Sequence, residues 1–79
     1  MIVHVRLYAT LRRHLPGAIL GQSTPIMLAD GATIADLVAR LAIPRATIKT
    51  AFVRGVVRDD EFVLREGDDV GIFPPIAGG

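Results

Sequence analysis

The last six residues of the chain suit chemistry on the main chain rather than on a side chain. They are Pro74, Pro75, Ile76, Ala77, Gly78 and Gly79. Adjacent prolines fix φ and favour an extended arm, and adjacent glycines form a thin tip without side chains. We therefore expect the arm to carry the carboxylate of Gly79 into a narrow pocket of a partner protein. The alternative interpretation is an inert, frayed chain end.

The side chains elsewhere form no recognisable catalytic or metal-binding set. The sequence has no cysteine and two histidines. His4 belongs to an alternating, strand-like segment and His14 follows two arginines, so the two share no metal-ligand spacing. The acidic run at residues 59–61 lacks the alternating ligands and the glycine of a calcium loop. We therefore predict that the chain binds no metal and has no catalytic activity of its own.

Length and composition restrict the class of protein. A chain of 79 residues, 51% of them hydrophobic, makes one small domain with a single core. No apolar run approaches the roughly 20 residues of a membrane span, and no signal-peptide pattern opens the chain. A net charge of +1 and few aromatic residues argue against nucleic-acid binding. We expect a cytoplasmic protein that binds neither nucleic acid nor membrane.

Charge is distributed unevenly along the chain. Residues 1–58 carry eight Lys or Arg and two acids, whereas residues 59–79 carry one Arg and six acids. The six acids are Asp59, Asp60, Glu61, Glu66, Asp68 and Asp69. Complementary charge mainly speeds docking and selects partners. One hypothesis is that these acids, which precede the arm, meet a basic surface of the enzyme that handles it; solvation of a small domain is the alternative.

Alternation of apolar and polar residues predicts several strands. Residues 2–8 place their apolar side chains on one side of an extended segment. Further strands are expected at residues 24–29, 51–54, 56–58 and 69–73. Pro25 predicts that the second strand either begins there or lies at a sheet edge. A short helical segment is expected at residues 9–15, and a turn before the last strand should place Gly67 at positive φ.

One amphipathic helix is predicted at residues 33–42. Thr33 is a good N-cap, and Asp36 three residues later gives an approximate capping box. The apolar residues of this segment form one stripe along the helix: Ile34, Leu37, Val38 and Leu41. A helix with a single stripe should lie across one face of a mixed sheet. The pattern therefore predicts a two-layer α+β domain.

The closing segment, residues 67–79, resembles that of the MoaD/ThiS family of small sulfur-carrier proteins. It shares a Gly-Asp turn, a last strand, a short apolar linker and a terminal Gly-Gly. Residues 7–13 also resemble the molybdopterin synthase branch of this family, and weaker similarity lies in residues 33–37 and 52–55. The resemblance implies a ubiquitin-like β-grasp fold, with about four to five strands, one main helix, and the first and last strands adjacent and parallel. It also implies one domain over residues 1–79, of which residues 74–79 form an extended, flexible tail.

The resemblance further implies a reaction at Gly79. In this family an ATP-using, ubiquitin-activating-like adenylyltransferase joins AMP to the carboxylate of the last glycine, and a sulfurtransferase supplies sulfur to make a thiocarboxylate. No stably bound cofactor is implied. Pro74 and Pro75 are most similar to the molybdopterin synthase branch, in which the tail enters the large subunit and donates sulfur for the molybdenum cofactor. Gly78 would then pass a constriction that excludes side chains.

Several expectations stay open. The candidate docking residues are Phe73, Arg6, Tyr8, Asp68 and Asp69, although Phe73 fits core packing equally well. Arg54 stands where relatives often have asparagine, a departure that could change the turn at Gly55. The alternative functions are sulfur carriage for thiamine, cysteine or tRNA thiolation, attachment to lysines as a protein modifier, and an interaction domain with an inert tail.

Overall fold

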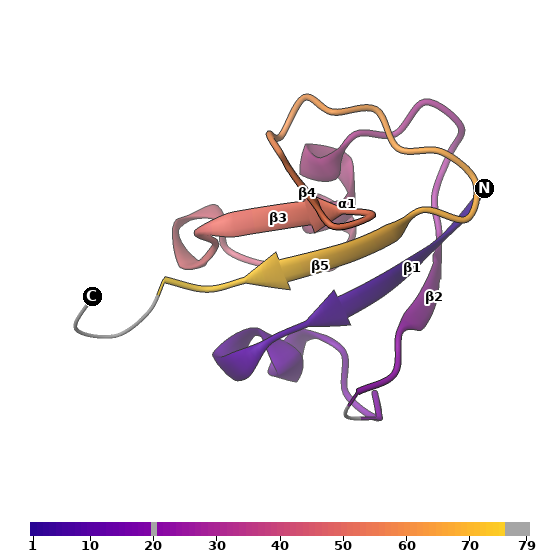
Figure 1. Ribbon diagram of the computed structural model, residues 1–79. Helices are drawn as coiled ribbons and strands as arrows, with labels where there is room; N and C mark the ends of the chain where they lie inside the picture. Colours follow the sequence, from indigo (N-terminus) through magenta and orange to yellow (C-terminus); the bar gives the residue numbers. More distant parts are fainter. Residues whose placement is uncertain (20, 76–79) are drawn as a thin grey trace.

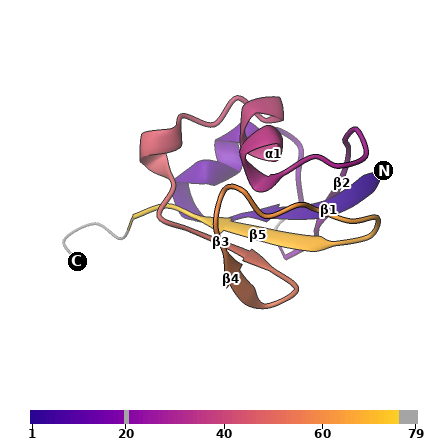
Figure 2. The ribbon, with the colours of Figure 1, turned by 90° about the horizontal axis from the view of Figure 1, so that it is seen from above.

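The computed structural model describes residues 1–19 and 21–75. These residues form a mixed sheet with helices on one side of it (Figure 1, Figure 2). The strands are β1 (Ile2–Leu7), β2 (Thr24–Met27), β3 (Thr50–Val53), β4 (Val56–Arg58) and β5 (Asp69–Phe73). The helices are α1 (Ile34–Arg40) and two short 3-10 helices, η1 (Ala9–His14) and η2 (Arg45–Thr47).

The first and last strands lie side by side at the centre of the sheet. The strand order is β2-β1-β5-β3-β4, with β1 and β5 parallel and the other neighbours antiparallel. Val5 pairs with Val70 and Leu7 with Ile72. Because parallel neighbours need a long crossover, the rest of the chain, including α1, forms the connection between them. This is the β-grasp topology, so the predicted fold is confirmed.

Local sequence explains the edge position of β2 and the tight turn that leads into the other edge strand, β4. Pro25 lies in β2, an edge strand, where the missing N–H costs no ladder hydrogen bond. The β3–β4 hairpin turns through Arg54 and Gly55, whose φ values of 52° and 82° fit the two-residue turn typical of tight hairpins. Arg54 thus adopts the backbone conformation that asparagine favours, and the turn keeps its form despite the unusual residue.

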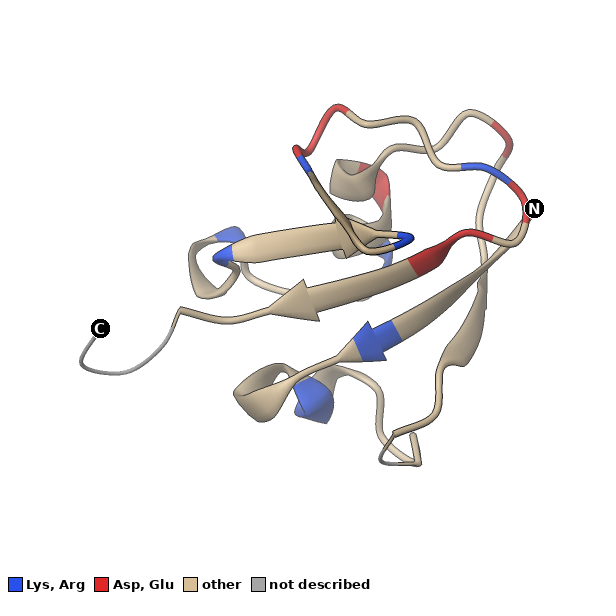
Figure 3. Ribbon diagram, viewed as in Figure 1, with Lys and Arg blue, Asp and Glu red and all other residues tan. Residues whose placement is uncertain are grey.

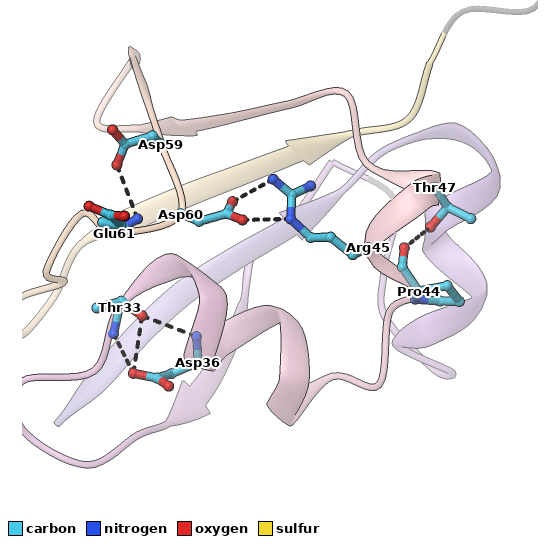
Figure 4. A network of polar contacts seen from close by, with 8 residues as sticks. All are labelled: Thr33, Asp36, Pro44, Arg45, Thr47, Asp59, Asp60 and Glu61. Carbon is cyan, nitrogen blue, oxygen red and sulfur yellow. Dashed lines mark hydrogen bonds and ion pairs between the residues drawn. The ribbon is translucent and has the colours of Figure 1, made fainter.

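The capping box predicted for α1 is present (Figure 4). The Thr33 N–H donates to Asp36 Oδ2 at 2.8 Å, and the Asp36 N–H donates to Thr33 Oγ1 at 3.2 Å. The helix ends at Arg40, two residues earlier than predicted. Ala42 has a φ of 56°, which stops the helix before Pro44.

The core lies between α1 and one face of the sheet. Val3, Val5, Leu37 and Ile72 have no exposed surface, and burying each such side chain contributes about 1.5–3 kcal/mol. Strand alternation sends the neighbours of these core residues to the second face, which α1 does not cover (Figure 2). All helices within the described ranges are too short to cross a membrane.

Candidate functional site

The second face of the sheet holds a hollow of about 320 Å³. It brings together four of the five predicted docking residues, which are Arg6, Tyr8, Phe73 and Asp69. Tyr8 directly follows β1, and Phe73 is the last residue of β5. Because β1 and β5 are parallel, their ends bring these two aromatic side chains to the same edge of the face.

Three aromatic rings form the apolar part of this hollow. The rings of Tyr8 and Phe73 are stacked, with centroids 4.1 Å apart and planes 3° from parallel. Phe52 of β3 meets Phe73 edge-on at 5.4 Å. Such pairs contribute about 0.5–1.5 kcal/mol each beyond area burial. Phe73 is half-buried on this face and lies outside the core cluster. Its side chain is therefore not part of the core, which was the alternative expectation for this residue.

Gly71 lets Tyr8 lie across β5. A Cβ added at Gly71 would come within 3.3 Å of Tyr8 Cε2 and 3.8 Å of Phe73 Cε1. A glycine inside a strand often marks such a close approach. The roles of Gly71 and Phe52 are not evident from the sequence, although Gly71, two residues before Phe73 in one strand, must share a face of the sheet with Phe73.

The arm begins at the edge of this aromatic face. The Lys49 N–H donates to the Phe73 carbonyl at 2.9 Å, and the Tyr8 N–H donates to the Ile72 carbonyl at 3.1 Å. These bonds fix the chain as far as Phe73. Pro74 is half-buried and Pro75 is exposed, both without regular secondary structure. The predictions for Ile76, Ala77, Gly78 and Gly79 concern residues outside the described part of the chain.

Asp68 does not belong to the docking surface predicted for it. The residue is 5% exposed, and its Oδ2 accepts from the Arg65 N–H at 2.8 Å. Its backbone carbonyl accepts from the His4 N–H at 2.8 Å. Asp68 therefore closes the turn before β5. In this turn Gly67 has a φ of 82°, so the predicted positive φ is confirmed.

Most of the other acids predicted to meet a partner also have local roles. Asp60 accepts two hydrogen bonds from the Arg45 guanidinium, at 2.6 and 2.7 Å, as Figure 4 shows. Asp59 Oδ1 accepts from the Glu61 N–H at 3.0 Å. Glu66 Oε1 accepts from the Ile2 N–H at 3.0 Å. Local turn and loop contacts therefore account for these three acids without a partner.

The acids nearest the arm in sequence are distant from it in space. Figure 3 shows acidic residues at the start of β5, at the opposite end from the arm. Asp69 begins β5 and Phe73 ends it, and a strand rises about 3.3 Å per residue. Four such steps separate the two residues by roughly 13 Å. The acids at residues 66–69 therefore do not surround the point where the arm leaves the sheet.

Together, the sheet order, the single main helix and the open aromatic face define a small ubiquitin-like domain. A model of the ThiS family matches residues 5–79. The chain belongs to this family, the MoaD/ThiS group of sulfur carriers and ubiquitin-like modifiers. No curated protein matches it.

Solved structures share the fold over nearly the whole chain. SAMP1 from Haloferax volcanii has 19% identity and a TM-score of 0.72, with 100% of both chains covered. A putative molybdopterin converting factor subunit 1 from Pyrococcus furiosus has 24% identity and a TM-score of 0.73, covering 95% of this chain and 98% of that one. A complex of subunits 1 and 2 of the molybdopterin-converting factor from Helicobacter pylori matches at 19% identity and a TM-score of 0.63, with 100% of both chains covered.

Proposed function

We propose that this chain carries sulfur as a thiocarboxylate on Gly79 and donates it as the small subunit of a molybdopterin synthase. The observation that carries the proposal is the position of Phe73. This residue completes the aromatic face and directly precedes the Pro-Pro arm. A partner that docks on the face therefore receives the arm at a fixed starting point.

The chemistry follows from the carboxylate. A carboxylate is a poor acyl donor because its leaving group would be oxide. Adenylation of Gly79 by an ATP-using activating enzyme releases pyrophosphate and makes AMP the leaving group. A persulfide of a sulfurtransferase then displaces AMP and forms an acyl disulfide. A thiol of the transferring enzyme cleaves that disulfide, which leaves the thiocarboxylate on Gly79 and a disulfide on the enzyme.

The chain must obtain its sulfur and its catalysts from partners. It has no cysteine, and among the described residues no cluster of His, Asp and Glu could hold a metal ion. The Helicobacter pylori structure is a complex of subunits 1 and 2. We propose the corresponding large subunit as the acceptor of the arm here, with an adenylyltransferase and a sulfurtransferase as the loading partners.

The test is reconstitution of loading. The full chain is incubated with ATP, a ubiquitin-activating-like adenylyltransferase and a persulfide-bearing sulfurtransferase, and its intact mass is measured. The expected result is replacement of one oxygen by sulfur, which requires ATP. An unchanged mass with active enzymes would contradict the proposal.

A second candidate function is protein modification, favoured by the fold that this chain shares with small archaeal modifier protein 1 of H. volcanii. In that case Gly79 forms an isopeptide bond with lysines of target proteins. A ladder of conjugates that requires Gly79 would support this function.

A further inference from the structure

A groove of about 610 Å³ lies between the edge strand β4 and the segment that leads to β5. We call it the β4 groove. Val56 from β4 and Val63 from the opposite wall line it. These two residues are 49% and 53% exposed. The groove therefore offers apolar surface to a ligand beside a strand edge, where a further extended segment can align.

The rim of the β4 groove is basic. Arg54, Arg58 and Arg65 all line it. None of the three takes part in an ion pair with another described residue. The Arg58 guanidinium lies 4.6 Å from the centroid of the Phe62 ring, so it is held over the groove wall.

The nearby acids do not neutralise this rim by ion pairing. Asp68 lines the groove, but it is buried and its carboxylate accepts from the Arg65 main chain. Glu66 bonds to the main chain of Ile2, and Asp59 to that of Glu61. Asp69 lines the aromatic hollow instead. Three guanidinium groups therefore remain available to carboxylates of a ligand.

The β4 groove and the aromatic hollow lie on different faces of the sheet. Val56 pairs with the buried Val53, and Arg58 pairs with the buried Ala51, so these side chains share the core-facing side. Phe52, between Val53 and Ala51, points into the aromatic hollow. A ligand in the β4 groove leaves the aromatic face and the start of the arm free.

We propose that the β4 groove is a second docking surface, which binds an extended acidic segment of a partner protein. Carboxylates of that segment pair with the three arginines, and its apolar side chains contact Val56 and Val63. The proposal rests on this groove alone and does not depend on sulfur carriage.

The test is an NMR titration of the isotope-labelled full chain. The probe is an acetylated, amidated pentapeptide that alternates glutamate and valine, and the matched probe has lysine in place of glutamate. We expect shifts at residues 53–58 and 62–65 with the acidic probe alone, and weaker binding as salt rises. The double variant Arg58→Gln/Arg65→Gln should bind about tenfold more weakly.

The control is the double variant Arg13→Gln/Arg40→Gln, which makes the same change in net charge on η1 and α1. It should bind the acidic probe as the unmodified chain does. Equal binding of both probes, shifts confined to the aromatic hollow, or no shifts at all would overturn the proposal. Concentration-dependent shifts of residues 53–58 without peptide would also overturn it, because they would assign the groove to a second copy of this chain.

Discussion

Gly71 and Tyr8 shape the open face at the scale of single residues. Tyr8 crosses β5 at the point where Gly71 lacks a Cβ, and its ring then stacks on Phe73. A glycine inside a strand costs about 0.5–1 kcal/mol relative to alanine. The chain therefore gives up some strand stability to hold the two rings together at the edge where the arm begins.

The first prediction tests this coupling. Gly71→Val should force the Tyr8 ring off β5 and abolish the nuclear Overhauser contacts between the Tyr8 and Phe73 rings. In a Tyr8→Ala background, the same substitution should stabilise the strand, because the Tyr8 ring no longer blocks the new side chain and Phe73 Cε1, 3.8 Å from the added Cβ, lies at ordinary contact distance. A double-mutant cycle on the free energy of unfolding should give a coupling of about 1 kcal/mol. Additive effects would show that Gly71 is not required for the position of Tyr8.

The second prediction separates a structural role of Asp68 from a docking role. Asp68→Ala removes the acceptor of the Arg65 N–H, which should lower the free energy of unfolding by about 1–3 kcal/mol. The exposed neighbour Asp69 is the control, and Asp69→Ala should change stability by less than about 0.5 kcal/mol. Urea unfolding measures both. If both substitutions changed the free energy of unfolding by equally small amounts, Asp68 would again be a candidate docking residue.

At the scale of elements, the local sequence predicted where the strands and the helix lie better than it predicted which strands pair and in which register. Alternation placed a strand at residues 2–8, and β1 covers Ile2–Leu7. Thr33 and Asp36 identified the start of α1, because a capping box is a local interaction. The end of α1 was predicted two residues late, because the left-handed conformation of Ala42 leaves no clear signal in an alanine.

The candidate site was predicted only in part, for a physical reason. Phe73, Arg6 and Tyr8 were identified from strand periodicity and from their relation to the arm. Phe52 was missed, because it pairs with Gly71, 19 positions away in the sequence, and local patterns do not reveal such a register. Sequence proximity also misplaced the acids of residues 66–69, since an extended strand separates them from the arm.

The third prediction concerns the β3–β4 hairpin. A residue other than glycine in the left-handed conformation costs roughly 1–2 kcal/mol, and asparagine tolerates it best. Arg54→Asn should therefore raise the free energy of unfolding by about 1 kcal/mol, which corresponds to a melting temperature roughly 4–8 °C higher. Arg54→Ala removes the same charge without favouring the turn, so it should give no such gain in calorimetry. An equal gain from alanine would attribute the effect to charge.

At the scale of the whole molecule, the sheet keeps the core and the two proposed docking surfaces apart in space. Its inner face holds the core, its outer face holds the aromatic hollow, and its β4 edge holds the basic groove. The two docking surfaces do not overlap in their proposed contacts, so a partner on the β4 groove is compatible with delivery of the arm.

The fourth prediction tests the arm as a narrow insert. Gly78→Val adds a branched side chain where the proposal places a constriction. It should abolish sulfur loading without changing the melting temperature, because residue 78 follows the last strand. Ala77→Val adds comparable bulk one residue earlier. Comparing the sulfur loading of the two variants shows whether the position of the added side chain matters. Full loading of Gly78→Val would refute the narrow-pocket argument.

The most direct measurement is fragmentation mass spectrometry of the intact chain purified from cells that produce its partners. Sulfur carriage on Gly79 predicts that one oxygen is replaced by sulfur, and that every fragment carrying the substitution contains Gly79. Sulfur on any other residue, or an unmodified carboxylate at Gly79 under conditions in which the activating enzyme and sulfurtransferase are active, would contradict it.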